Sequence, residues 1–335
     1  MTLKPDYIDA YTNLSLVLVK QGKLDEAIAS AHKSLQVRLA GIKPSAGVEK
    51  LAGLLIELER IPVIYQNEAE VQKCRDHFTA CLNEALALVS NRSQEFTEQE
   101  REILKDSLFR LTNFYLGYQQ QNDKELEVAY AKLATSILEP ELKPYLQAVS
   151  PRRSSAKSKI RVGVASGLLK DHNGTYWAYE WLAKLPSEDY EFFLYSLNGR
   201  TDDFTKKFAA LGTYRWLPFR QNNYLHALET IKQDDLDILL LPDVGMTPAS
   251  RIISLARLAP IQCVGWGHPI TTGSSNIDYY LSSDLMENKE ADEHYSEKLI
   301  RLPNLGLCLE DSTTMPKPQA VKRSDFNIPQ NKVVY

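Results

Sequence analysis

The 335-residue sequence has few cysteines, no concentrated positive charge and no long apolar run. Its four cysteines form no CxxC pair, which predicts reduced thiols rather than a metal site or a disulfide framework. No run approaches the roughly 20 apolar residues that a membrane-spanning helix requires, and the opening MTLKPDYIDAY lacks the basic and apolar regions of a signal peptide. The formal net charge is −4 and no lysine–arginine stripe occurs, so nucleic acid is not a favoured partner. We expect a soluble, cytoplasmic protein that binds neither membrane nor nucleic acid.

What is present divides into two halves. From residue 7 to residue 149, glycine and proline are sparse and apolar residues recur every three or four positions, which predicts a series of helices. One helix is expected over residues 103–120, and Thr97 is expected to begin another, with Glu100 as its capping-box partner. We interpret residues 41–149 as a helical spacer. Residues 150–158 are polar, basic and rich in serine, which predicts a linker.

From residue 159 to residue 310, apolar runs alternate with helical patterns. The runs that predict strands are IRVGVAS, EFFLYSL, LDILLLPD, IQCVGWG, IDYYLSS and EKLIRLP. This alternation predicts a parallel sheet with helices on both faces, that is, an α/β Rossmann-like lobe. Ligands of such sheets gather at the carboxyl ends of the strands, so the loops after VGVAS, ILLLP and CVGWG are the first places to look for a site.

Residues 1–40 contain a segment, DAYTNLSLVLVKQGKLDEAIASAHKSLQ, that resembles a tetratricopeptide repeat. The positions that match the aromatic, large, small, large, glycine and small pattern of that repeat are Tyr11, Leu14, Ser15, Leu18, Gly22 and Ala27. Small residues let two antiparallel helices pack closely, and the glycine permits the turn between them. Because one repeat cannot bury both of its faces, this one either caps the helical region or continues an array.

Four segments together give the sequence a resemblance to the O-linked N-acetylglucosamine transferase family, in its bacterial SPINDLY-type branch. They are IRVGVASGLLKDHNGTYWAYEWL, DILLLPDVGMTPASRIISLARLAPIQCVGWGHP, ITTGSSNIDYYLSSDLMENKEADEHYSEKLIRLPNLG and TNFYLGYQQQNDKELEVAYAKL. The third is the most diagnostic, because LAPIQ, a glycine–threonine loop, IDYYLSSD and HYSEKLIRLP occur in order at close spacing. The matches cover most of the chain.

The resemblance implies the first lobe of a two-lobed GT-B glycosyltransferase. Such enzymes transfer a sugar from a nucleotide-sugar, such as UDP-GlcNAc, to a serine or threonine hydroxyl of a protein, with inversion and without a metal or other cofactor. The helical repeats are expected to bind the protein acceptors. In the family the second lobe supplies most of the nucleotide-binding groups, and residues 311–335 correspond to its start. The resemblance therefore implies that the chain is an N-terminal portion, inactive alone.

Two other functions stay open. The first is a non-enzymatic scaffold, in which the repeats bind a partner protein and the α/β lobe is a remnant. The second is another nucleotide-sugar enzyme of the same architecture, such as an epimerase. The repeat disfavours the second, because repeats recruit proteins rather than small acceptors.

His172 is the candidate catalytic residue, since it matches the family's histidine in the loop after the first strand of the lobe. An imidazole there could contact the acceptor or orient the sugar. The alternative is a histidine that caps the helix beginning near Thr175. Asp243, at the end of the strand LLLP, could touch the acceptor or help to cap the helix near Pro248, where Thr247 is the expected capping residue.

The loop GHPITTG is the other candidate, because glycines let backbone N–H groups approach a ligand and threonines add hydroxyl groups. The family places this loop in the cleft, near the diphosphate and the acceptor; the alternative is a tight turn that binds nothing. Its proposed cleft residues are Gly267, His268, Pro269, Thr271, Thr272 and Gly273. A D-x-D sequence at Asp235–Asp237 precedes its strand instead of following it, so no metal site is expected there.

Overall fold

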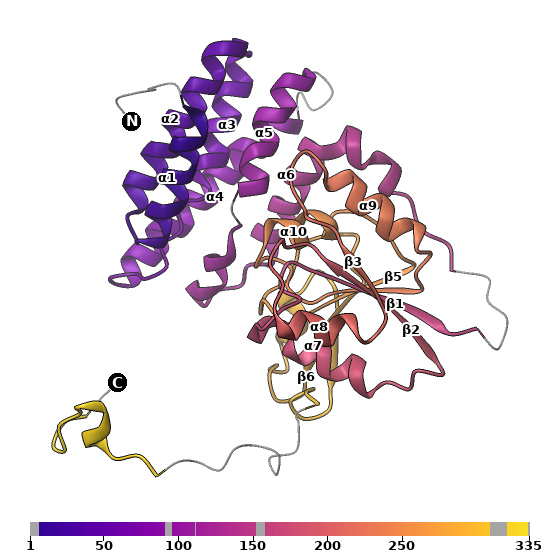
Figure 1. Ribbon diagram of the computed structural model, residues 1–335. Helices are drawn as coiled ribbons and strands as arrows, with labels where there is room; N and C mark the ends of the chain where they lie inside the picture. The colour runs from indigo at the N-terminus through magenta and orange to yellow at the C-terminus, as the bar shows by residue number, and fades with distance from the viewer. Residues whose placement is uncertain (1–6, 91–95, 111, 152–157, 309–319, 334–335) are drawn as a thin grey trace.

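The computed structural model describes residues 7–90, 96–110, 112–151, 158–308 and 320–333. The first half is helical, as expected (Figure 1). Its α-helices are α1 (Ile8–Lys20), α2 (Leu24–Ile42), α3 (Ala46–Glu57), α4 (Glu68–Ser90), α5 (Glu98–Arg110) and α6 (Lys124–Leu142), and its 3-10 helices are η1 (Phe114–Gln119) and η2 (Lys143–Tyr145).

The first two helices form the hairpin that the repeat pattern predicts. Gly22 lies in the turn between them with φ +73°, a left-handed conformation that glycine adopts without strain. Ser15 and Ala27, two of the small positions, are both 1% exposed. The hairpin extends to Ile42, two residues beyond the predicted boundary at residue 40. Its assignment as a tetratricopeptide repeat stays a prediction.

The capping box at the start of α5 is confirmed. The backbone N–H of Thr97 donates to Glu100 Oε2 at 2.9 Å, and that of Glu100 donates to Thr97 Oγ1 at 3.3 Å. The single helix expected over residues 103–120 is wrong, because α5 ends at Arg110 and η1 begins at Phe114. In the break, Asn113 turns its side chain to a buried carboxylate of α6, a contact between distant residues that helical periodicity does not reveal.

The second half is a Rossmann-like lobe with seven parallel strands in the order β3-β2-β1-β4-β5-β6-β7. The strands are β1 (Ile160–Ser166), β2 (Tyr190–Ser196), β3 (Thr213–Trp216), β4 (Ile238–Leu241), β5 (Ile261–Gly265), β6 (Tyr279–Ser283) and β7 (Lys298–Leu302). Six of them were predicted; the edge strand β3 was not. From β1 the chain adds β2 and β3 on one side of the sheet, and it then returns to add β4 to β7 on the other side. The boundary between β1 and β4 is therefore the topological switch point, where such folds bind ligands.

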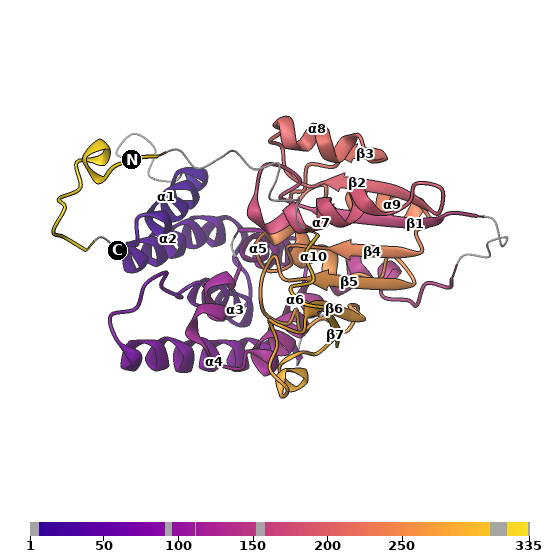
Figure 2. The same ribbon diagram turned by 90° about the horizontal axis from the view of Figure 1, so that it is seen from below.

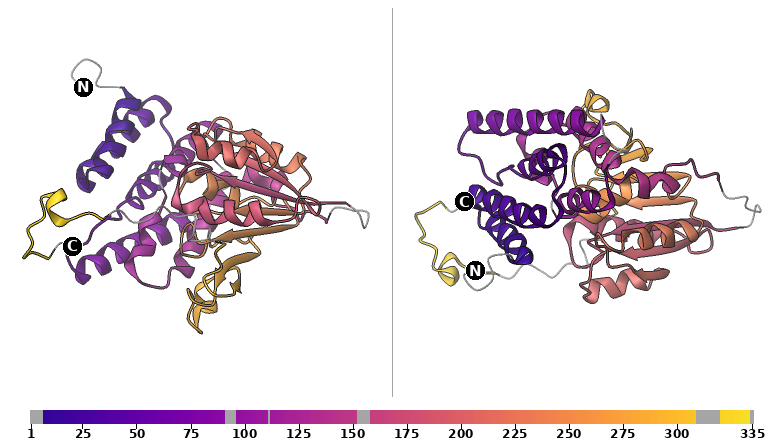
Figure 3. Two further views of the ribbon diagram at one scale, coloured as in Figure 1. Left: turned by 60° about the horizontal axis from the view of Figure 1, so that its bottom comes forward. Right: turned by 90° about the horizontal axis from the view of Figure 1, so that it is seen from above.

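Helices cover both faces of the sheet (Figure 1). On one face, α7 (Asn173–Lys184) and α8 (Asp203–Ala209) pack on Val162, Leu194 and Leu240. On the other face, α9 (Tyr224–Gln233) and α10 (Pro248–Ser254) belong to one apolar core that continues into α3, α4, α5 and α6. The helical half is therefore packed onto the lobe, and it extends past the carboxyl ends of the strands (Figure 2 and Figure 3).

The remaining segments are short. In the described segments after β6, the 3-10 helix η3 (Ala291–His294) precedes β7 and the 3-10 helix η5 (Arg323–Phe326) lies in residues 320–333. Most of the expected linker, residues 152–157, lies outside the described residues, as do residues 309–319, 334 and 335. Of the predicted start of a second lobe at residues 311–335, the structure therefore describes residues 320–333. Among the described residues, no helix combines the length and the apolar character that crossing a membrane requires.

Candidate functional site

Three strand ends meet at the switch point. Gly167 follows β1, Asp243 follows β4 and Gly267 follows β5. The contacts there are so close that only glycine fits: a Cβ at Gly267 would lie 2.0 Å from the carbonyl oxygen of Pro242 and 3.0 Å from that of Gly174. The turn that carries His172 and the start of the glycine–threonine loop therefore lie side by side, at the carboxyl edge where ligands of this fold bind.

His172 is the N-cap of α7. Its Nδ1 accepts from the Gly174 N–H at 3.1 Å, so the neutral ring carries its proton on Nε2. Burial, together with the positive charge of Lys170, lowers the pKa of His172 below its usual value of 6.5. The capping alternative is thus what the structure shows. A contact with substrate would use Nε2–H as a donor, a role suited to orienting a ligand rather than to removing a proton.

Asp243 is fully buried beneath this turn, with 0% exposure. Its Oδ2 accepts from the Gly167 N–H at 3.3 Å, while its Oδ1 has no hydrogen-bond partner in the described part of the chain. Burial raises the pKa of Asp243 to about 7, although bonds from Ser166 and Gly167 oppose this rise. The cap of α10 is Thr247, as expected, since its Oγ1 accepts from the Ser250 N–H at 3.3 Å. Asp243 therefore holds the turn after β1 in place through its hydrogen bond with Gly167.

His268 is buried, at 3% exposure, and its ring stacks on Phe114 of η1 with centroids 4.7 Å apart. Burial, reinforced by the positive charge of Arg251, lowers the pKa of His268 to about 3. The ring is therefore neutral at physiological pH. Gly245, with φ +94°, leaves room for it, because a Cβ there would lie 2.3 Å from His268 Cδ2. In this loop Pro269 is exposed and Gly267 half-exposed.

The two threonines do not present hydroxyl groups to the edge of the sheet. Both are 2% exposed, and a buried carboxylate takes their hydrogen bonds. Glu297 accepts from Thr271 Oγ1 at 2.6 Å and from the Thr272 N–H at 2.8 Å, and it also accepts from the Thr272 hydroxyl. Gly273, with φ +68°, packs against the backbone of Glu127 in α6. In this loop Gly267 and Pro269 thus remain available to a ligand, whereas His268, Thr271 and Thr272 are buried.

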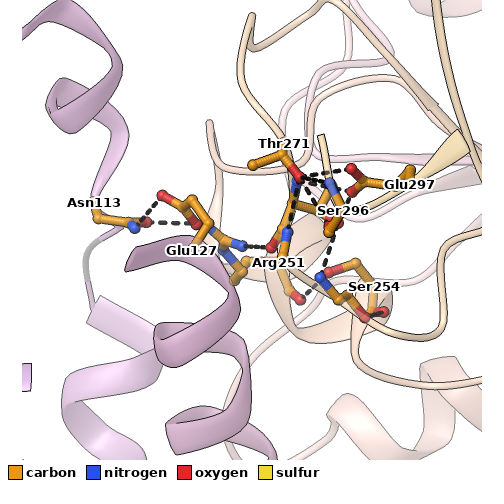
Figure 4. Close-up of polar contacts among 10 residues, drawn as sticks. Asn113, Glu127, Arg251, Ser254, Thr271, Ser296 and Glu297 are labelled. Atoms are coloured by element: carbon orange, nitrogen blue, oxygen red, sulfur yellow. Dashed lines mark hydrogen bonds and ion pairs between the residues drawn. The ribbon is translucent and has the colours of Figure 1, made fainter. Parts of the chain in front are cut away.

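A buried polar cluster joins this loop to the helical half (Figure 4). Arg251 of α10 donates to the Thr272 carbonyl oxygen at 2.6 Å and to Asn113 Oδ1 at 3.0 Å, and it forms an ion pair with Glu127. Burial raises the pKa of Glu127 to about 7, against the lowering effect of Arg251. Arg251, Asn113 and Glu127 were not among the predicted site residues. The available signal was a charged residue inside the apolar helical patterns PASRIISLARL and KELEVAYAKL.

A cavity of about 800 Å³ opens beside the switch point. The lobe contributes Gly167 after β1, Asn198 after β2, Trp216 at the end of β3 and Thr247 before α10, and the helical half contributes α1 and α5. Its volume is in the range of small-molecule and peptide sites. The sequence alone does not reveal this cavity, because residues far apart in the chain, such as Leu16 and Phe219, form its walls.

No group of three or more histidine, cysteine, aspartate or glutamate side chains could hold a metal ion in the part of the chain that the structure describes. The D-x-D sequence lies at the amino ends of the strands, away from the candidate site. There Asp237 accepts from the Arg161 N–H at 2.8 Å, at the start of β1. The four cysteines are free.

This architecture, a Rossmann-like lobe whose switch point is walled by a helical region, is that of the first lobe of a GT-B glycosyltransferase. The sequence profile of glycosyl transferase family 41 matches residues 128–323, and the chain belongs to this family.

Several known proteins are similar to the chain. A probable UDP-N-acetylglucosamine–peptide N-acetylglucosaminyltransferase, SEC of Arabidopsis thaliana, is 25% identical over 191 residues, which are 55% of this chain and 19% of that protein. A UDP-glucose:protein N-beta-glucosyltransferase of Actinobacillus pleuropneumoniae is 39% identical over 80 residues, 24% of this chain and 13% of that protein. The chain thus spans less than a fifth of the length of these relatives.

A solved structure shares the fold. A mutant of the Thermobaculum terrenum O-GlcNAc transferase aligns with a TM-score of 0.57 at 20% identity, over 91% of this chain and 52% of that one. The alignment includes the helical half as well as the lobe.

Proposed function

We propose that the intact protein is a cytoplasmic protein O-glycosyltransferase. It transfers a sugar from a nucleotide-sugar donor, such as UDP-GlcNAc, to serine or threonine hydroxyl groups of protein acceptors, with inversion and without a metal. Family membership and the similarity to protein glycosyltransferases support the class of reaction. The observation that carries the proposal is the meeting of the His172 turn, Asp243 and Gly267–Pro269 at the carboxyl ends of the strands, beside a cavity that the helical half helps to line.

In this proposal each group has a limited task. His172 donates from Nε2–H to a substrate oxygen and so orients it, since Nδ1 is occupied by the Gly174 N–H. Asp243 does not touch substrate; it positions the turn after β1 through Gly167. Gly267–Pro269 supplies a closely approachable backbone. The helical half binds the acceptor polypeptide next to these turns.

The test is a transfer assay on the intact gene product with matched substitutions at His172. Purified protein is incubated with UDP-GlcNAc or UDP-glucose and with peptides that carry one serine, threonine or asparagine, and products are identified by mass spectrometry. His172→Ala removes both the imidazole and the cap, whereas His172→Asn retains a good capping residue. We expect His172→Asn to fold as stably as the parent but to transfer about 10- to 100-fold more slowly.

The outcomes separate the alternatives. Equal transfer by the His172→Asn variant would show that the histidine acts only as a cap. Transfer to asparagine alone would replace the hydroxyl acceptor by an amide. A protein that transfers no sugar from either donor, yet binds a partner through its helical half, would be the non-enzymatic scaffold.

A further inference from the structure

The cavity beside the switch point has an apolar portion in its lining. Leu16 of α1, Phe109 of α5, Leu197 after β2 and Phe219 after β3 line it. Phe109 and Phe219 stack with ring centroids 5.8 Å apart, so this lining is fixed by packing within the fold. An apolar side chain of an occupant would gain free energy by replacing the water against these four residues.

The charged groups of the lining are balanced except for one. Asp106 pairs with Arg38 at 3.3 Å, and Arg110 donates from Nε to Glu59 at 3.1 Å. The guanidinium of Arg220 has no hydrogen bond or ion pair within the described ranges, and Arg220 is exposed at the rim. The backbone N–H of Arg220 donates to Asn223 Oδ1 at 2.8 Å, and its carbonyl oxygen accepts from the Asn223 N–H at 3.1 Å, so these contacts leave the guanidinium unengaged. The cavity therefore favours a ligand with a negative charge at that point.

Trp216 provides an aromatic surface at the same rim. Its Nε1 donates to the Asn198 carbonyl oxygen at 3.0 Å, which orients the indole, yet 57% of the residue is exposed. A large aromatic side chain that is both held and exposed is typical of a binding surface.

We propose that this cavity selects acceptor polypeptides in which an acidic side chain, bound by Arg220, and an apolar side chain, packed on Trp216 and Phe219, flank the acceptor hydroxyl. This inference rests on the proposed transferase function and names its acceptor class. Arg220 and Trp216 are specificity-determining residues rather than parts of the sugar-transfer chemistry.

A nucleoside diphosphate fits the cavity less well than an acidic peptide. A diphosphate requires several donors at once, usually backbone N–H groups and more than one cation. Here the Gly167 N–H already donates to Asp243, and Arg220 is the one lining cation without a partner among the described residues. One unpaired cation above an apolar lining matches a single carboxylate on a polypeptide.

The experiment is a charge exchange between protein and peptide. Fluorescent peptides with one threonine and a neighbouring leucine carry glutamate, glutamine or lysine at each flanking position in turn, and their binding to the purified chain is measured by anisotropy. The parent chain should prefer the glutamate peptide at one position by about two- to fivefold, the range expected for one exposed ion pair. Arg220→Gln should abolish this preference, and Arg220→Glu should reverse it in favour of lysine.

Two further variants make the result specific. Trp216→Ala should weaken all three peptides alike, by about five- to tenfold, and leave the charge preference in place. Lys289→Glu changes the same charge at an exposed residue after β6, outside the cavity, and should alter nothing. If the Arg220→Glu variant kept the preference for glutamate peptides, the inference would be overturned. Displacement of the bound peptide by UDP would also overturn it, because the cavity would then be a nucleotide site.

The same peptides in the transfer assay keep this inference separate from the proposed function. Transfer without any charge preference would leave the transferase standing and remove the role of Arg220. Charge-dependent binding without transfer from either donor would leave the peptide site standing and remove the transferase.

Discussion

At the scale of single residues, two titratable side chains lie at the site in unusual states. The pKa of His172 is lowered chiefly by burial, and burial raises that of Asp243 to about 7. Both groups therefore tend toward their neutral forms near neutral pH, where a buried charge would be costly. Asp243 still accepts one backbone hydrogen bond at its Oδ2, which keeps Gly167 in place.

The buried aspartate makes a pH-dependent contribution to stability. Its folded pKa of about 7 exceeds the usual value of 3.8, so the unfolded chain releases the proton first and folding becomes less favourable as pH rises between these values. Asp243→Asn keeps an acceptor for Gly167 but cannot ionise. We expect its stability relative to the parent to rise by about 2–4 kcal/mol from pH 4 to pH 7 in urea titrations. Asp203→Asn, at an exposed position, is the control. If the free energies of unfolding of Asp243→Asn and the parent changed in parallel with pH, the raised pKa of Asp243 would be refuted.

The sequence could identify the residues that follow the strand ends, because a general rule of α/β sheets names those positions. The loops that carry His172, Asp243 and Gly267 were identified in this way, whereas His172 itself was chosen because it matches a histidine of the transferase family. It could not show that Thr271 and Thr272 are buried, since their partner Glu297 and the covering helix α6 are far away in the chain. A loop composition rich in hydroxyl groups does not say which way those groups point.

At the scale of elements, α10 and α6 are joined by the buried pair of Arg251 and Glu127. The same arginine holds the Thr272 carbonyl oxygen, so the position of the glycine–threonine loop depends on a helix of the other half. A buried pair is not in itself a strong stabiliser, but removing one member leaves an uncompensated charge.

Removing one member of this pair should therefore lower the free energy of unfolding strongly, and removing both should lower it by less than the sum of the two single effects. We expect Arg251→Met to destabilise the chain by about 3–5 kcal/mol, and Arg251→Met combined with Glu127→Gln to cost less than the sum of the two singles. Chemical denaturation measures the stabilities, and amide exchange at residues 270–273 should accelerate in Arg251→Met. Lys206→Ala, from a fully solvated pair, should change stability by at most about 1 kcal/mol. Additive single effects would contradict the coupling.

Element prediction failed where contacts between distant residues decide the backbone. Helical periodicity continues through residues 103–120, yet Asn113 leaves the helix to pair with Glu127. Strand β3 has four residues on the sheet edge, and all four are only partly buried or exposed, so it lacks the continuous apolar run that marks the central strands.

At the scale of the whole molecule, the helical half and the lobe share an apolar core, and both line the cavity beside the switch point. The alternation of strands and helices was enough to predict the lobe, and the segments that resemble the transferase family predicted the class. How the halves pack was not predictable, because the contacts depend on side chains such as Arg251 and Phe114 whose partners lie in the other half. The helical half is therefore a wall of the site as well as a spacer.

The measurement that tests this arrangement most directly is amide hydrogen exchange of the 335-residue chain with and without a saturating acidic threonine peptide. Binding at the carboxyl edge predicts slower exchange at residues 167–174, 197–200, 216–221 and 243–247, with no change around Asp235 and Asp237 at the opposite edge. Protection confined to the opposite edge, or to α3 and α4 away from the sheet, would contradict a site built where the two halves meet.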